Sequence, residues 1–158
     1  KAVSLTFYPP KGRRSLSTST PAASFGAKHS AAEYIAEVNR SVSVFATVET
    51  GEAVANIESL VAVDGLAGVS IGTGDMALSM GLVGQRTAPQ VQEAARTIIA
   101  ACKKVGKQVM LPASNLAAAR TALDLGVTGI QFPASALFIE PSKRLLAGVR
   151  TALSEKVA

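Results

Sequence analysis

Residues 42–62 read VSVFATVETGEAVANIESLVA, a short apolar run rich in β-branched residues that is followed directly by a helical pattern. The run at 42–48 predicts a buried strand, because β-branched and aromatic residues favour the extended backbone. The stretch at 52–62 has apolar residues at helical spacing, which predicts a helix with one buried face. The unit is therefore a strand followed by a helix.

The same unit recurs three more times along the chain. Further strands are predicted at 67–71 (AGVSI), 108–111 (QVML) and 126–132 (GVTGIQF). Further helices are predicted at 88–105, 116–125 and 142–157, the last with Leu145, Leu146, Val149 and Leu153 as its apolar side. Four consecutive β/α units predict a parallel sheet, because parallel neighbours need a crossover and a helix is the usual one.

Two architectures of the α/β class satisfy this pattern: an open doubly wound sheet, and part of a closed (β/α)8 barrel. A complete barrel takes about 250 residues, so the 158 residues present here supply about half of one. We expect residues 1–41 to form an irregular loop and a connecting helix, and residues 42–158 to form the four units. A half-barrel would leave both sheet edges unpaired and its inner apolar faces partly covered, at Val44, Val69 and Ile130 for example.

The composition is that of a folded, soluble domain. Apolar residues make up 48% of the chain and charged residues 17%, and no apolar stretch reaches the length of a membrane span. The net charge of +5 is local, because the first 30 residues carry five basic and no acidic groups while the remaining 128 are balanced. Basic clusters interleaved with aromatics are lacking, which argues against nucleic acid as a partner.

Other catalytic residue types are scarce. Cys102 is the single cysteine and lies in a helical pattern, so we expect a buried structural thiol rather than a nucleophile, and a reducing, cytoplasmic location. His29 is the single histidine and lies in a polar stretch, where we expect an exposed side chain. No serine-hydrolase elbow, Walker loop or paired CxxC occurs.

Two carboxylates follow neighbouring strands. Glu49 ends the first strand and Asp75 follows the second, so both should lie at the rim formed by the carboxyl ends, where the functional groups of both architectures gather. Oxygen ligands of this kind suit a hard divalent cation. The alternative interpretation is that each acid caps the helix after it.

A nucleotide site is a weaker alternative for the same stretch. Residues 72–77 (GTGDMA) match the G-x-G-x-x-G/A dinucleotide pattern, and Glu93 lies at a suitable distance for a ribose. However, Asp75 would place a negative charge where a pyrophosphate must bind, and Glu93 falls inside the next predicted helix.

Residues 9–30 read as a long irregular loop, either a functional segment or a solvated connection.

Taken together, the segments resemble the HpcH/HpaI aldolase and citrate lyase family, the metal-dependent class II pyruvate aldolases. The resemblance is carried by 8–14 (YPPKGRR), 47–50 (TVET) with Ala53 and Asn56, 68–81 (GVSIGTGDMALSMG), 106–107 and 125–127. It implies that the chain is the C-terminal half, about strands 5 to 8, of a (β/α)8 barrel. It also implies a homo-oligomer, a trimer or hexamer, in which C-terminal helices are exchanged between neighbours.

The resemblance further implies an aldehyde-lyase that cleaves 4-hydroxy-2-oxo acids to pyruvate and an aldehyde. Glu49 and Asp75 would bind Mg²⁺, Mn²⁺ or Co²⁺, which stabilises the pyruvate enolate. Backbone amides around Gly74 and Asp75 would receive the substrate carboxylate, and Thr47 stands where the family commonly has a glutamine that contacts pyruvate.

Thr73 and Gly74 likewise replace the family's usual proline and small residue. The family's catalytic histidine and substrate-binding arginine come from earlier strands, and His29 does not match that histidine. No catalytic residue is therefore assigned within the chain, and the isolated chain is expected to be inactive. The alternative is a catalytically inactive half-barrel that serves as an assembly or binding module.

Overall fold

The computed structural model describes residues 1–157 and contains one four-stranded parallel sheet. Its strands, in spatial order, are β1 (Val44–Val48), β2 (Leu66–Ile71), β3 (Gln108–Pro112) and β4 (Gly129–Gln131). The helices that alternate with them are α3 (Gly51–Ala55), α4 (Ile57–Val61), α5 (Thr73–Ser79), α6 (Pro89–Lys104), α7 (Leu116–Asp124) and α8 (Ala134–Val157). Before the sheet lie α1 (Ala2–Thr6), a 3-10 helix at Pro21–Gly26 and α2 (Ala31–Ser41).

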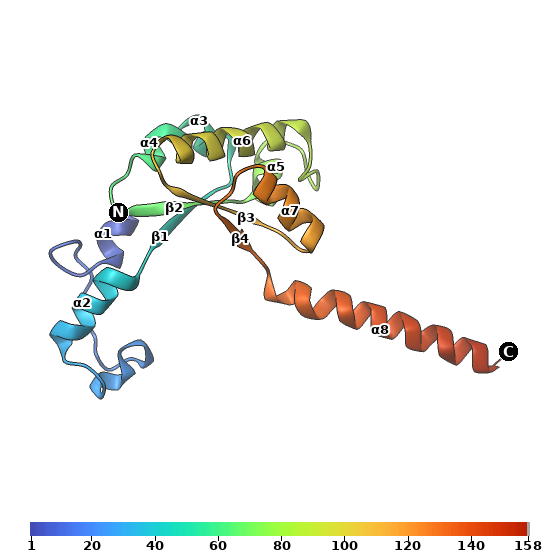
Figure 1. The fold of residues 1–158 in the computed structure, drawn as a ribbon, viewed down its shortest axis with the longest axis horizontal. Coiled ribbons are helices and arrows are strands. Elements are labelled where there is room, and N and C mark those ends of the chain that lie inside the picture. The colour runs from blue at the N-terminus through green and yellow to red at the C-terminus, as the bar shows by residue number, and fades with distance from the viewer. Residues whose placement is uncertain (158) are drawn as a thin grey trace.

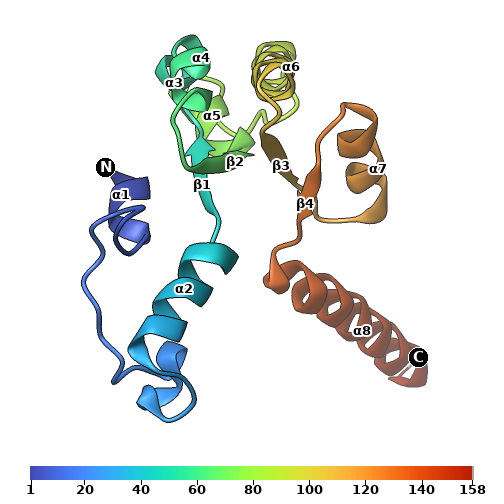
Figure 2. The same cartoon turned by 60° about the vertical axis from the view of Figure 1, so that its left-hand side comes forward.

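The strand order distinguishes between the two predicted architectures. The strands follow one another across the sheet in chain order, whereas a doubly wound sheet reverses its order at a switch point. Helices α3, α4, α6 and α7 lie along one side of a curved sheet (Figures 1 and 2). The prediction of half a (β/α)8 barrel is confirmed, with four β/α units in sequence.

The main core lies between this outer face of the sheet and the helices. Helix α6 contributes the largest share of it, with Val91, Ile98 and Cys102 fully buried in the same cluster as Val69 and Ile71 of β2. Val44 and Ile130 also pack against this cluster. The expectation that Val44, Val69 and Ile130 lie on the inner face is wrong, because alternate residues of a strand point to opposite faces and the helix side takes these three.

The inner face of the sheet is therefore more polar than expected. Ser70 and Gln131 alternate with core residues of β2 and β4, and the Ser70 hydroxyl donates to Gln131 Oε1 at 2.7 Å across β3. Thr47 faces the same side, between Ala46 and Val48. The lumen side of this half-barrel thus carries hydrogen-bonding groups beside apolar ones, because Phe45 and Met110 alternate with the core residues of β1 and β3.

The segment before the sheet has a small core of its own. Tyr8, Ala23, Tyr34 and Val38 pack together, with the Tyr8 and Tyr34 rings edge to face at a centroid distance of 6.1 Å. Helix α2 begins with a complete capping box, in which the Ser30 side chain accepts from the Glu33 amide and the Glu33 carboxylate accepts from the Ser30 amide. The segment thus combines an irregular stretch at 7–20 with the connecting helix α2, and adds α1 and a 3-10 helix that were not predicted.

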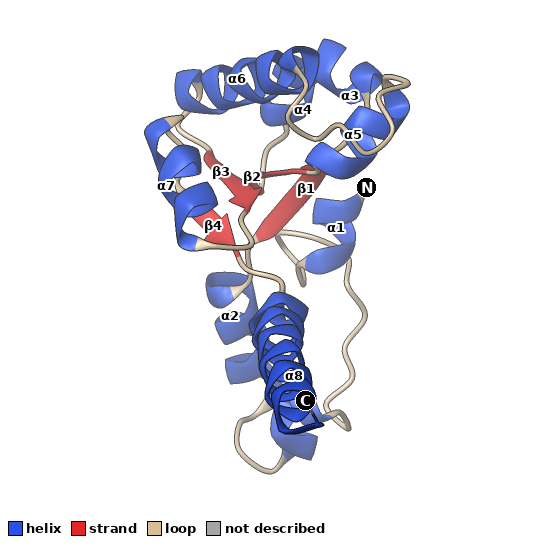
Figure 3. Ribbon diagram, turned by 90° about the vertical axis from the view of Figure 1, so that its right-hand side faces the viewer, coloured by secondary structure: helices blue, strands red, loops and turns tan. Residues whose placement is uncertain are grey.

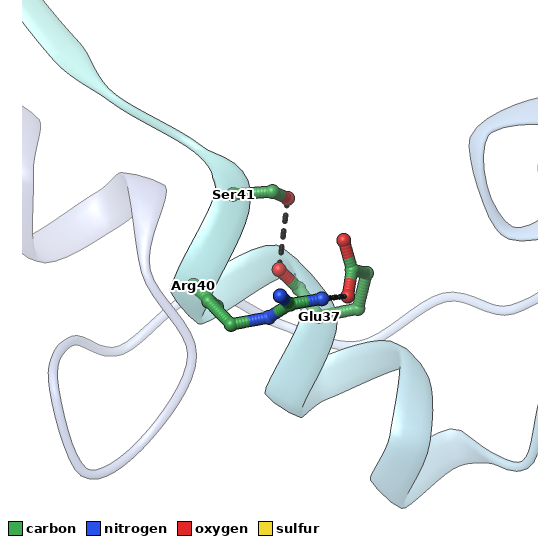
Figure 4. A network of polar contacts seen from close by, with 3 residues as sticks. All are labelled: Glu37, Arg40 and Ser41. Carbon is green, nitrogen blue, oxygen red and sulfur yellow. Dashed lines mark hydrogen bonds and ion pairs between the residues drawn. The ribbon is translucent and has the colours of Figure 1, made fainter.

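Helix α2 ends at an exposed ion pair. Arg40 pairs with Glu37 one turn earlier, and the Ser41 hydroxyl donates to the Glu37 carbonyl at 2.8 Å (Figure 4). Because both charged side chains face water, this pair adds little to stability. Its position at the last turn does suit the helix dipole, since Arg40 is a cation near the carboxyl end.

Several elements differ from the sequence prediction, among them β4, which is shorter than the predicted strand at 126–132. The helix predicted at 52–62 is divided at Asn56, whose φ of −101° and ψ of 15° interrupt the helical geometry. The last helix begins at Ala134 and continues through Pro141 rather than starting after it. A proline removes one helical hydrogen bond. Helix α8 can continue through Pro141 because it is exposed, so that the unpaired carbonyl is open to solvent. Helix α5 was not predicted, because seven residues give too short a pattern.

Candidate metal and substrate site

Glu49 lies directly after β1, at the carboxyl rim of the sheet. The Gly72 amide donates to the Val48 carbonyl at 3.0 Å, so the parallel pairing of β1 and β2 continues up to Glu49. A Cβ built on Gly72 would lie 2.8 Å from Glu49 Cβ and 3.0 Å from its Oε2. Only glycine at this position leaves room for the half-buried Glu49 side chain against the end of β2.

Asp75 lies in the first turn of α5, three residues after Gly72, with an exposed side chain. The structure therefore places Glu49 and Asp75 at the same end of neighbouring strands, as the sequence predicted. The two acids share the rim rather than opposite ends of the sheet.

Neither acid is the N-cap of the helix that follows it, although Asp75 does lie in the first turn of α5, where a carboxylate suits the helix dipole. Thr50, not Glu49, is the N-cap of α3, and its hydroxyl accepts from the Ala53 amide at 3.1 Å. The N-cap of α5 is Gly72, and no side chain makes a capping hydrogen bond there. Neither carboxylate is therefore engaged in capping the helix that follows it.

Thr47 and Gly74 lie beside the two acids. Thr47 Cγ2 is 3.4 Å from the position of a Cβ on Gly72, so Thr47 and Glu49 lie against the same glycine. Gly74 is in the first turn of α5 together with Asp75. Amides of a first helical turn have no acceptor within the helix and remain able to donate to a ligand.

The donor set fits a hard divalent cation. Two carboxylates are what such an ion takes from a protein when waters and substrate oxygens supply its other ligands. Among residues 1–157 there is no group of three or more His, Cys, Asp or Glu side chains that could hold an ion. A cation at this rim would thus keep open coordination positions.

The other predicted candidates lie outside this rim. His29 is exposed, as expected. Cys102 is fully buried in α6, as expected for a structural thiol, and burial raises the pKa of its thiol. Glu93 lies on the exposed side of α6 and pairs with Arg96 at 2.9 Å, a position that does not support the nucleotide interpretation.

The Tyr-Pro-Pro loop after α1 is held by α2. Asn39 accepts from the Tyr8 amide at 2.9 Å and donates to the Tyr8 carbonyl at 3.1 Å. The Arg14 guanidinium lies over the Tyr8 ring at 4.9 Å, and burial raises the pKa of the Tyr8 phenol against the opposing effect of Arg14. These contacts tie the loop to its own small core rather than to Glu49 or Asp75.

The sequence did not predict two polar contacts near the carboxyl ends of the strands. One is the Ser70–Gln131 hydrogen bond, whose partners are 61 residues apart. The polar residue within each of the apolar strands β2 and β4 could have predicted this bond, because a buried polar side chain needs a hydrogen-bond partner. The other is Arg86, whose guanidinium lies against Gly74 and which no spacing rule connects to α5.

A family model described as HpcH/HpaI aldolase/citrate lyase matches residues 1–135. The chain belongs to this family. The HpcH/HpaI resemblance inferred from the motifs is thereby confirmed.

Within residues 1–157, no helix has the length and apolar character needed to cross a membrane.

Curated relatives and solved structures agree with this assignment. A 5-keto-4-deoxy-D-glucarate aldolase of Klebsiella pneumoniae subsp. pneumoniae is 36% identical over 128 residues, which cover 81% of this chain and 49% of the relative. The chain therefore spans about half the length of the curated relatives it matches. An HpcH/HpaI family protein from Burkholderia cenocepacia J2315 superposes with a TM-score of 0.82 at 29% identity, over 94% of this chain and 59% of that one.

A second family structure gives a similar result. The HpcH/HpaI aldolase from Desulfitobacterium hafniense DCB-2 superposes with a TM-score of 0.77 at 27% identity, over 95% of this chain and 57% of that one. Macrophomate synthase superposes with a TM-score of 0.79 over 98% of this chain and 55% of that one, but at 23% identity it supports the fold alone.

Proposed function

We propose that the protein is a divalent-metal-dependent aldehyde-lyase that cleaves 4-hydroxy-2-oxo acids to pyruvate and an aldehyde. The observation that carries the proposal is the placement of Glu49 and Asp75 at one rim, with the Glu49 side chain lying against Gly72. Family membership and the aldolase names of the curated relatives support it.

In this proposal Glu49 and Asp75 hold Mg²⁺, Mn²⁺ or Co²⁺. The bound cation supplies a Lewis acid for the negative charge that develops on the pyruvate keto oxygen. The first-turn amides at Gly74 and Asp75 receive the substrate carboxylate, since they lie at the start of α5. Thr47 helps to orient the bound acid, because its side chain lies against the same glycine as Glu49.

Replacement of Asp75 by asparagine tests the metal site. Asp75→Asn removes one of two anionic ligands, so Mn²⁺ affinity should fall at least tenfold, within the usual range for changes around a metal site. The rate of pyruvate release should fall by orders of magnitude, while the unfolding midpoint stays nearly unchanged because the side chain is exposed. Mn²⁺ binding is measured by electron paramagnetic resonance and pyruvate by a coupled assay.

Asp124→Asn is the matched control for this experiment. Asp124 is an exposed acid at the end of α7, and its replacement changes the net charge equally. It should bind Mn²⁺ like the wild type. Wild-type Mn²⁺ affinity in Asp75→Asn would remove Asp75 from the proposed site.

Aldol cleavage is proposed to require a second half-barrel as well. The chain supplies two acids at the rim but no histidine there, and general acid–base help contributes about 10²–10⁴-fold to a reaction. We therefore expect no pyruvate release by the 158-residue chain alone and partial recovery when it is mixed with a separately expressed N-terminal half of a full-length relative. Robust release by the chain alone would contradict this requirement.

The proposed protein partner is a second copy of the same chain. Helix α8 projects from the sheet (Figure 1). Its apolar residues Leu145, Leu146, Val149 and Leu153 are exposed. A second copy, in a trimer or hexamer, is the proposed cover for this face, and the proposed location is the cytoplasm. If the chain assembles but neither binds Mn²⁺ nor supports cleavage in the mixture, the alternative of an inactive assembly module is favoured.

A further inference from the structure

A cavity of about 430 Å³ lies beside α5, between the start of α6 and α7. Its apolar wall comes from the end of β3 and from α7, where Leu111, Ala118 and Leu125 line it. Its polar wall comes from Thr73, Arg86, Thr87 and Gln92, with Ser114 on the other side. None of the side chains that line it is acidic.

Arg86 is the single charged group of this cavity. Its Nε and one terminal nitrogen lie 3.3 Å from the position of a Cβ on Gly74, so the guanidinium lies against the first turn of α5. A side chain at residue 74 would push against the guanidinium, so glycine there permits this approach. Within the described chain, the ion pairs involve other residues, and Arg86 forms neither an ion pair nor a hydrogen bond to protein.

The neighbouring groups add hydrogen-bond donors without negative charge. Thr73, Thr87 and Ser114 carry hydroxyls that form no hydrogen bond within the described residues, and Gln92 carries a carboxamide. The 16-residue helix α6 begins between Thr87 and Gln92 with no side-chain cap and no acidic residue in its first turn. Its partial positive charge therefore adds to that of the guanidinium.

We propose that this cavity binds a small anion, a carboxylate or phosphate group, with Arg86 as its charge partner. A guanidinium presents a planar set of N–H donors that matches both oxyanions. Arg86 is exposed to solvent, so the apolar wall strengthens the interaction only modestly relative to open water. The proposal rests on the cavity and on Arg86, and it is independent of the proposed metal chemistry.

Two sources of the oxyanion are distinguishable. It belongs either to a second acidic group of the molecule bound at the Glu49 and Asp75 rim, because Arg86 lies against the neighbouring residue Gly74, or to a separate ligand. A group of the rim substrate would be displaced when 2-oxoglutarate, a 2-oxo acid with a second carboxylate, and Mn²⁺ are added. A separate ligand would bind equally well in their presence.

The experiment is calorimetric titration of the protein with inorganic phosphate and with malonate at low ionic strength. Arg86→Gln should weaken binding of at least one anion tenfold or more, and Arg86→Lys, which keeps the charge but not the fork of donors, should lose less. The matched control is Arg120→Gln, which removes an exposed arginine of α7 that does not line the cavity. Arg120→Gln should bind as the wild type does.

Competition with 2-oxoglutarate and Mn²⁺ then assigns the source. Wild-type affinity for both anions in Arg86→Gln, an equal loss in Arg120→Gln, or no measurable binding by the wild type would overturn the proposal. Circular dichroism checks each variant's fold, and Arg86→Lys provides the comparison if Arg86→Gln does not fold. Asp75→Asn should retain anion binding, so failure of the aldolase proposal and failure of this one give different results.

Discussion

Helices α6 and α8 have similar sequence patterns but different surroundings in the structure. Both repeat apolar residues at helical spacing. In α6 seven residues are buried, with Val91, Ile98 and Cys102 fully inaccessible. In α8 the equivalent residues face solvent, and Leu145 is 70% exposed. Figure 3 shows α6 lying across the strands while α8 extends below them.

The difference teaches that an apolar stripe predicts the need for a partner but does not identify the partner. Helix α6 connects β2 to β3, so the crossover holds its stripe against those strands. Helix α8 follows β4, and its stripe does not pack against the strands within the described residues. The same pattern therefore forms the core of the chain in one place and an uncovered face in the other.

The largest expected effect is on the α6 side of this comparison. Ile98→Ala removes a fully buried side chain from the main core and should lower the free energy of unfolding by about 2–5 kcal/mol, the usual range for truncations that leave a cavity. Leu146→Ala on α8, where the side chain is 56% exposed, should change it by less than about 0.5 kcal/mol. Urea unfolding at low protein concentration measures both.

The protein concentration must be low because self-association would bury the apolar stripe of α8 and increase the loss of stability in Leu146→Ala. Equal losses in the two variants would mean that α8 is buried in solution even in the monomer. That result would contradict the arrangement in which the two helices differ.

The next effect concerns assembly rather than folding. Leu153→Glu places a charge on the exposed stripe of α8, and burying an unpaired charge is costly. Self-association should weaken at least tenfold, while the unfolding midpoint of the dissociated chain stays unchanged. Analytical ultracentrifugation of Leu153→Glu beside Glu155→Gln, a change on the same helix that removes a charge, measures it. An unchanged association constant for Leu153→Glu would exclude this stripe from the interface.

The smallest effect belongs to α2, which depends on its cap as well as on packing. Hydrogen bonds from Ser30 lower the pKa of Glu33 below its ordinary value. The stabilisation that these bonds provide is therefore fully present above the ordinary pKa of glutamate. It is lost as the pH falls through the lower pKa of the folded state. Ser30→Ala should cost about 1 kcal/mol at neutral pH and less in acid. Urea unfolding at several pH values measures the difference.

Ser154→Ala provides the control for the cap. The Ser154 hydroxyl bonds back to the Arg150 carbonyl in α8 and caps no helix, so its loss should be small at every pH. If the cost of Ser30→Ala were independent of pH, Glu33 would have no part in the cap.

The sequence by itself determined the four β/α units, the shared rim of Glu49 and Asp75 and the buried thiol of Cys102. These follow from local patterns: β-branched runs, helical spacing, and the rule that the carboxyl ends of parallel strands meet at one edge. The family motifs then identified half a barrel, where periodicity alone had left the doubly wound sheet open. The metal-binding and substrate-binding roles of Glu49, Asp75, Gly74 and Thr47 stay predictions.

Only the tertiary structure decided which face of each strand the helices cover and what lies next to Gly74. A strand exposes both faces equally in sequence, so Val69 was expected on the inner side although it packs under α6. Ser70 meets Gln131, and Arg86 meets Gly74, across separations that no spacing rule spans. Thr50 rather than Glu49 caps α3 because one residue of register decides which side chain reaches the free amides.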